Sequence, residues 1–165
     1  MQEYEKIQAY YYTAVDQAEK KLVLGSLGWT NDRSLKNRTL EWTLSGEGVK
    51  TQDFFYPMGS VSGSGNEGTE LSWEFFQKNL PRIQTKIGKA SSSLMDACIF
   101  NCCGGFLSNE RADEIESFFK TNPLPKSGRK ISQMIENIRA NASLLEYLKQ
   151  YDELNDPQFW KSLLP

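Results

Sequence analysis

Apolar residues recur along most of the chain at the three- and four-residue spacing of an amphipathic helix. The spacing is clearest over residues 129–150, where Ile131, Met134, Ile135 and Ile138 share one helical face. Alternation of apolar and polar residues bounded by turn residues, which is typical of a half-buried strand, is scarce. The pattern therefore predicts an all-α fold.

Turn-forming and capping residues indicate where the helices begin and end. Asp32 offers a side-chain oxygen to cap the helix that follows it, and Pro123 ends the helix that precedes it. In the second helix, Val15, Ala18 and Leu22 recur at i, i+3 and i+7, which is the spacing of one apolar helical face. The glycine- and serine-rich segment 60–68 is typical of a solvent-exposed loop. The expected helices cover residues 3–12, 15–24, 34–44, 51–60, 69–80 with a further turn to 87, 91–106, 109–121, 129–150 and 156–163.

The expected helices pair into hairpins of similar length. The first helix of each hairpin begins near residues 3, 34, 68 and 110, and this spacing falls in the range of helical-hairpin repeats. A single hairpin cannot bury its own apolar face, so stacked neighbours supply the missing cover. We expect one helical-repeat domain over residues 1–165, an α-α superhelix of about four hairpins. A closed helical bundle is the alternative.

Histidine is absent from the sequence, and its absence limits the chemistry of the chain. Serine and cysteine hydrolases with a histidine base, and zinc sites of the HExxH type, are excluded. Nineteen Lys and Arg residues against 21 Asp and Glu residues give a formal net charge of −2, which disfavours a phosphate-binding surface. No apolar run is long enough to span a bilayer. We therefore expect neither a nucleic-acid nor a membrane partner.

The three cysteines, Cys98, Cys102 and Cys103, lie close together in one expected helix. An odd number of cysteines in one short segment does not form a disulfide framework, which favours a reducing compartment. One helix cannot place four ligands tetrahedrally around zinc, so we expect buried cysteines that act as small apolar side chains. We expect no catalytic residue and no metal ligand in the chain.

Several polar residues are interleaved with apolar ones at positions where stacked hairpins would bury them. The expected polar network between helices consists of Gln52, Asp53, Glu136 and Asn137. The functional alternative is a polar concave surface that faces a peptide or another domain. On such a surface, Arg129 and Lys130 could meet a carboxylate of the ligand, which makes them the candidate substrate-binding residues.

Four runs and one pair of motifs carry a family resemblance over nearly the whole chain. They are Leu27–Asp32, Val49–Asp53, Leu71–Asn79 and Arg129–Asn141, with Phe118-Phe119 ahead of Pro123-Leu124-Pro125. In these segments the chain resembles the C-terminal helical domain of zinc aminopeptidases. The puromycin-sensitive and endoplasmic-reticulum aminopeptidases are the close relatives in this resemblance.

The resemblance implies a HEAT-like superhelix that covers the catalytic domain of the same polypeptide. Such a domain encloses a large cavity and receives the distal part of peptide substrates, so it implies two partners, the catalytic domain and a peptide. The family's zinc belongs to the catalytic domain, so the resemblance implies no cofactor in this chain. It implies a parent protein that is an enzyme, in the cytoplasm or alternatively in the lumen of the endoplasmic reticulum.

Two other functions are compatible with the sequence. The first is a free-standing α-solenoid adaptor that binds a partner protein on its concave face. The run Tyr10-Tyr11-Tyr12 makes the first hairpin unusually apolar and indicates a missing preceding repeat, which favours a fragment over the adaptor. The second is an independent enzyme that uses Cys102 or a carboxylate pair, but it lacks a base and a binding loop.

Overall fold

The computed structural model describes residues 2–45, 48–88 and 92–163. All regular secondary structure in these ranges is helical, which confirms the all-α prediction. The α-helices are α1 (Gln2–Thr13), α2 (Gln17–Ser26), α3 (Arg33–Leu44), α4 (Phe55–Ser62), α5 (Asn66–Ile87), α6 (Ser92–Cys103), α7 (Asn109–Thr121), α8 (Gly128–Leu148) and α9 (Pro157–Ser162). Short 3₁₀ helices are η1 (Leu27–Trp29), η2 (Thr51–Asp53), η3 (Pro125–Ser127) and η4 (Asp152–Asn155).

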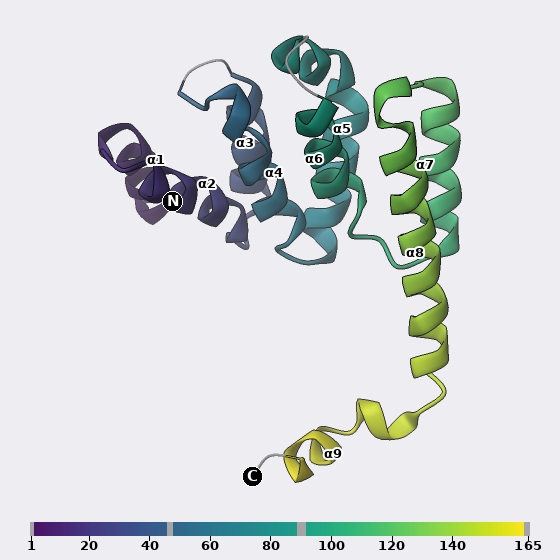
Figure 1. The fold of residues 1–165 in the computed structure, drawn as a ribbon. Helices are drawn as coiled ribbons and strands as arrows, with labels where there is room; N and C mark the ends of the chain where they lie inside the picture. Colours follow the sequence, from purple (N-terminus) through teal and green to yellow (C-terminus); the bar gives the residue numbers. More distant parts are fainter. Residues whose placement is uncertain (1, 46–47, 89–91, 164–165) are drawn as a thin grey trace.

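The first eight α-helices form four hairpins that stack side by side, α1/α2, α3/α4, α5/α6 and α7/α8 (Figure 1). The second helices of the hairpins contact one another in order, from α2 through α4 and α6 to α8. The first helices form another layer, in which α3 contacts α5. This arrangement confirms the predicted superhelix of about four hairpins.

The hydrophobic core runs through the stack between the two layers. Its largest fully buried side chains include Trp73, Phe76, Leu40, Leu24 and Ile138, which come from all four hairpins. All three cysteines are buried there as free thiols, as the apolar pattern of their helix predicts. The core therefore joins the hairpins to one another, and none of them is stabilised alone.

The segment 60–68 is not the exposed loop that its composition predicts. Helix α4 continues to Ser62 and α5 begins at Asn66, so only residues 63–65 connect the two helices. The physical reason is a close approach at Gly68, where an added Cβ would lie 1.9 Å from the carbonyl oxygen of Val61. Glycine serves here to let two helices cross closely.

Of two further predictions about the helices, one is confirmed in extent and one is wrong. The expected further turn from Pro81 to Ile87 is present and ends at Gly88, and it is continuous with the preceding turns in the single helix α5. In α2 the buried residues are Val23 and Leu24, whereas Leu22 is 73% exposed. The spacing of apolar residues therefore predicts that α2 is a helix, but it does not predict which face of α2 is buried.

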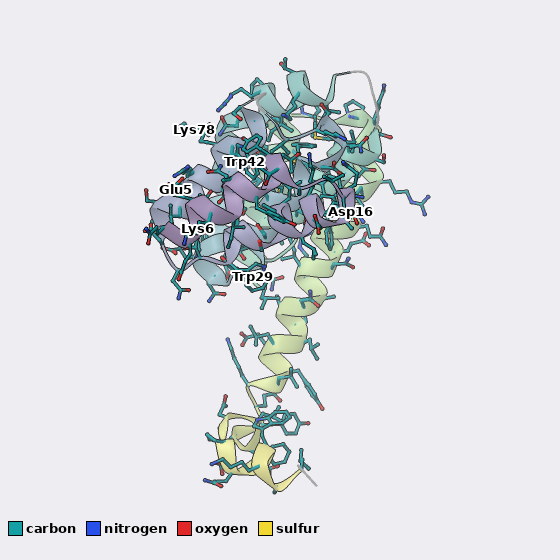
Figure 2. All side chains as sticks on the ribbon, turned by 90° about the vertical axis from the view of Figure 1, so that its left-hand side faces the viewer. Glu5, Lys6, Asp16, Trp29, Trp42 and Lys78 are labelled. Atoms are coloured by element: carbon teal, nitrogen blue, oxygen red, sulfur yellow. The ribbon has the colours of Figure 1, made fainter. Side chains whose placement is uncertain are left out.

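The last part of the chain stands apart from the stack. The C-terminal half of α8 extends beyond the other helices, and α9 lies below them (Figures 1 and 2). We call residues 143–163 the C-terminal arm. Neither η4 nor α9 buries a residue, and large apolar side chains of the arm are exposed, including Leu144, Tyr147, Leu148 and Trp160.

A buried lysine gives the stack a dependence on pH. Lys36 is 4% exposed, and its Nζ lies 3.1 Å from the Oε2 atom of Glu67 on α5. The hydrogen bond from Lys36 lowers the pKa of the Glu67 carboxyl below its ordinary value, and Arg33 acts in the same direction. A carboxyl whose pKa is lower in the folded state contributes stability above the unfolded pKa and loses it as pH falls through the folded pKa.

We therefore expect the free energy of unfolding to fall as pH drops below about 4.3, the unfolded pKa of glutamate. The substitution Glu67→Gln is expected to lower stability at neutral pH and to make the acid-induced loss shallower. Urea denaturation at neutral and acid pH measures both effects, with Glu153→Gln on the C-terminal arm as the control. An identical pH dependence in Glu67→Gln and the unsubstituted chain would contradict this role of the ion pair.

Candidate functional site

The described residues carry no cluster suited to metal-dependent or nucleophilic catalysis. No group of three or more Cys, Asp or Glu side chains among them is arranged to hold a metal ion. Burial raises the pKa of the thiols of Cys98 and Cys103 well above the ordinary value, so both stay protonated near neutral pH. Cys98 and Cys103 are therefore poor nucleophiles, and all three cysteines are buried, so we sought a candidate site on the surface.

Across the parts of the chain that the structure describes, no helix combines the length and the apolar character needed to cross a membrane.

Aromatic and cationic side chains meet across the layer of second helices. Lys21 on α2 places its Nζ 5.8 Å from the ring centroid of Tyr56 on α4. Lys130 on α8 places its Nζ 5.2 Å from the ring centroid of Phe100 on α6. Between these pairs, Gly59 on α4 lies against the side chain of Asn101 on α6. These contacts form a surface that we call the second-helix face, and it crosses all four hairpins.

The second-helix face is hollowed where α6 meets the start of α8. The hollow has a volume of about 380 Å³ and is lined by Ser93, Asp96, Ala97, Phe100, Asn101 and Lys130. The Oδ1 atom of Asp96 is buried and accepts no hydrogen bond from the described residues. Asn101 donates from Nδ2 to the carbonyl oxygen of Ala97 at 2.8 Å, so its amide group is held in place. The wall of the hollow combines polar groups with the half-exposed aromatic ring of Phe100.

The structure places the two predicted substrate-binding residues differently. Lys130 is partly buried and lines the hollow, whereas Arg129 is exposed and does not line it. Consecutive residues on a helix point about 100° apart, and Lys130 is the one that faces α6. Arg129 and Lys130 therefore both lie in the first turn of α8, but their side chains point to different sides of that helix.

The four residues of the predicted polar network are not brought together. Asp53 is buried, which confirms its expected burial, but Gln52, Glu136 and Asn137 are exposed, so the burial expected for these three is wrong. Gln52 and Asp53 lie in η2 and precede the second helix of their hairpin. On α8, the buried positions leave 136 and 137 on the outward side, with Glu136 beside the groove between α7 and α8. Alanine at these three exposed positions is expected to cost little stability.

Sequence reasoning missed Asp96, Phe100 and Asn101 as members of the candidate site. A signal was present, because Asp96 is the one charged residue in the otherwise uncharged helix α6. A charge on a largely apolar helix is retained at a cost unless it is paired or solvated. Lys130, the cation that lines the same hollow, lies 34 residues away in the sequence and comes near only through helix packing.

Comparison with known proteins shows to which protein family the chain belongs. The ERAP1-like C-terminal domain matches residues 1–140. Aminopeptidase M1 of Arabidopsis thaliana is 33% identical over 151 residues, which are 92% of this chain and 16% of that protein.

Two other relatives match over a similar range. The puromycin-sensitive aminopeptidase of Caenorhabditis elegans is 28% identical over 156 residues, covering 91% of this chain and 16% of that protein. Aminopeptidase 2, mitochondrial, of Saccharomyces cerevisiae is 28% identical over 139 residues, covering 84% of this chain and 14% of that protein. The chain thus spans about a sixth of the length of these curated relatives. With a match over most of its length, it belongs to the ERAP1-like C-terminal domain family.

Proposed function

We propose that this chain is the non-catalytic C-terminal domain of a zinc aminopeptidase, which covers the active site and helps to bind peptide substrates. The observation that carries the proposal is the family match over residues 1–140 in a sequence without histidine. A catalytic zinc of the HExxH type requires histidine ligands, so the zinc belongs to the catalytic domain of the same polypeptide. This chain alone is expected to release no amino acid from peptide substrates.

The first hairpin supports the proposal that this chain is one part of a larger polypeptide. It exposes apolar side chains, with Ile7 at 41%, Tyr10 at 46% and Leu22 at 73% exposure. Figure 2 looks onto this end of the stack. The stacked part of the last hairpin carries ion pairs instead, from Arg139 on α8 to Asp113 and Glu116 on α7, and the exposed apolar side chains of α8 lie beyond it in the C-terminal arm. Repeat stacks end in polar hairpins, so the apolar first hairpin fits a stack that continues with a preceding hairpin of the same polypeptide.

The second-helix face is the surface we propose for peptide substrates. It offers aromatic rings, backbone near Gly59 and the positive charge of Lys130, with Arg129 at the same end of α8. Arg129 and Lys130 are proposed to meet carboxylates of the peptide. The free buried cysteines favour a reducing compartment, so we propose the cytoplasm, with the lumen of the endoplasmic reticulum as the alternative.

Charge reversal tests the role of these two residues. In the full-length polypeptide, Arg129→Glu and Lys130→Glu are expected to raise KM for long peptides without basic residues about threefold to tenfold, as for loss of one moderate charge contact. The KM for dipeptide-like substrates is expected to stay unchanged, because these do not reach the second-helix face. Lys78→Glu, on α5 in the other layer, is the matched control. Equal changes for long and short substrates would remove Arg129 and Lys130 from the peptide path.

The exposed apolar side chains of the C-terminal arm favour a second candidate function. Leu144, Tyr147 and Leu148 are 54%, 53% and 39% exposed, which is typical of a surface that another protein covers. A free-standing adaptor that binds a partner protein would use such a surface. The adaptor differs from the aminopeptidase domain in one measurable property, because it would occur in cells without a catalytic domain on the same polypeptide.

A further inference from the structure

Three amide side chains follow one side of α8 at equal intervals. Gln133, Asn137 and Asn141 are exposed and four residues apart, so they rise in steps of about 6 Å along the helix and lie within roughly 80° of one another around it. We call these three side chains the amide row. By the same geometry, Lys130 lies in this sector of the helix, and its side chain contacts Phe100 on α6. The amide row therefore extends the second-helix face along α8 toward the C-terminal arm.

The amides of the row make no hydrogen bond to any other residue that the structure describes. Asparagines elsewhere in the helices use their amides within the chain, because Nδ2 of Asn79, Asn101 and Asn122 each donates to the carbonyl oxygen four residues earlier. A primary amide has two N–H donors and one oxygen acceptor. Each side chain of the amide row therefore offers both kinds of hydrogen-bonding group to a ligand.

The charges around the amide row favour a neutral ligand. Between Lys130 and the end of α8, the charged residues Glu136, Arg139 and Glu146 all lie outside the sector that holds the row. A neutral ligand that needs both donors and acceptors is a peptide backbone, since each residue other than proline carries one N–H and one C=O group.

The spacing of the amide row matches an extended backbone. In an extended peptide, the N–H and C=O groups that point to one side recur every two residues, about 6.7 Å apart. The step of about 6 Å between amides on the helix differs from this repeat by less than about 1 Å. Rotation of the glutamine and asparagine side chains can absorb such a difference. Successive amides can therefore bond to alternate residues of one extended chain.

The amide row leads to apolar side chains where α8 extends beyond the stack (Figure 1). Leu144 and Leu148 lie in the same sector of the helix as the row, and both are exposed. An apolar side chain of a ligand that covered them would gain free energy from the surface removed from water. The strip therefore combines polar groups for a backbone with apolar surface for one side chain.

We propose that the amide row binds the backbone of an extended peptide, and that Leu144 and Leu148 of the C-terminal arm contact an apolar side chain of the same peptide. This inference rests on the proposed function, because it takes the ligand of the second-helix face to be a peptide. It adds the substrate class: extended peptides of varied sequence that carry one apolar side chain at the position that reaches the arm.

The test uses fluorescently labelled peptides, whose binding to the full chain is measured by fluorescence anisotropy. From Gln133 to Leu148 the helix rises about 22 Å, which about seven residues of an extended chain span, so the probes have about ten residues. They consist of alanine and serine with a single phenylalanine, which is placed at each position in turn. The phenylalanine that reaches the arm is expected to give the tightest binding, and it fixes the register of the peptide.

Alanine variants test the amide row. Gln133→Ala, Asn137→Ala and Asn141→Ala together are expected to weaken binding about tenfold to hundredfold, as for the loss of two or three hydrogen bonds. Alanine favours helix formation, so the variant is expected to stay folded, which circular dichroism checks. The control combines Asn37→Ala with Gln84→Ala, which remove exposed amides from α3 and α5 in the other layer, and it is expected to leave binding unchanged.

Methylated peptides test whether the backbone is what the row binds. In the tightest-binding peptide, N-methyl groups on alternate residues remove the N–H donors from one side of the extended chain and keep those on the other side. One alternation is expected to weaken binding about tenfold or more, and the opposite alternation to change it by about twofold or less. Leu148→Ser is expected to remove the gain from phenylalanine.

The possible failures are distinguishable. Unchanged binding by the triple alanine variant, or equal effects of the two methyl alternations, would overturn the amide row and leave peptide binding by the second-helix face standing. A gain from phenylalanine that survives Leu148→Ser would overturn the contact with the arm. If none of the peptides binds, peptide binding by the second-helix face is contradicted, and this inference fails with it.

Discussion

Replacement of Trp73 with alanine is expected to cost about 3–5 kcal/mol of stability, the usual loss for a large aromatic side chain removed from a core. Trp73 is 1% exposed and lies where the third and fourth hairpins meet. Its ring centroid is 6.1 Å from that of Phe76 and 5.1 Å from that of Phe118 on α7. Its Nε1 donates a hydrogen bond to Oε1 of Glu114 at 2.8 Å, so the substitution also leaves a partly buried carboxylate without that donor.

Urea denaturation of the Trp73→Ala variant measures this loss, and Trp29→Ala is the matched control. Trp29 is 61% exposed in the turn after α2, so its removal is expected to change stability by about 0.5 kcal/mol or less. Similar losses for the two variants would contradict the account of how the hairpins are joined. A large loss for Trp73 alone would establish that the α5–α7 aromatic contact stabilises the stack.

The second large effect is expected at Gly68, where alanine should destabilise the chain although it favours helix formation. In an ordinary helix interior, glycine to alanine stabilises by up to about 1 kcal/mol. At Gly68 the added Cβ would lie 1.9 Å from the carbonyl oxygen of Val61 and 2.4 Å from the Oγ atom of Ser64. The serine side chain can rotate away, but the backbone oxygen cannot, so α4 and α5 have to separate.

We expect Gly68→Ala to cost about 2–3 kcal/mol, in the range of overpacked cores. Gly25→Ala on α2 is the control, because no atom lies within 4 Å of its added Cβ, and it is expected to be neutral or slightly stabilising. Thermal and urea denaturation of both variants give the comparison. If Gly68→Ala were as stable as Gly25→Ala, the close helix crossing would not be what requires glycine there.

The helices could be predicted because their signals are local. Asp32 accepts hydrogen bonds from the backbone N–H groups of Ser34 and Leu35, as expected for the residue before a helix. Leu35 and Trp42 are two helical turns apart in α3, a spacing typical of one helical face, and both are buried. Capping and periodicity depend only on neighbours in the sequence, so one sequence is enough to read them.

Features that depend on packing between helices could not be predicted. Glycines in segment 60–68 have the composition of a loop, and only the distance between α4 and α5 reveals that Gly68 is needed at a crossing. Asp96 and Lys130 form one hollow because α6 lies beside α8, and nothing local in either helix indicates this. The pattern places Glu136 on the wrong side of α8, because a polar residue inside an apolar stripe can point either way.

The most direct test of the central proposal is the composition of the natural protein. An antibody raised against this chain captures the endogenous protein from its source cells, and the captured species is measured for its polypeptide length, bound zinc and release of N-terminal residues from peptides. The account predicts one polypeptide several times longer than 165 residues, with zinc and aminopeptidase activity. A zinc-free polypeptide of about this length, without activity, would contradict it and establish the free-standing adaptor instead.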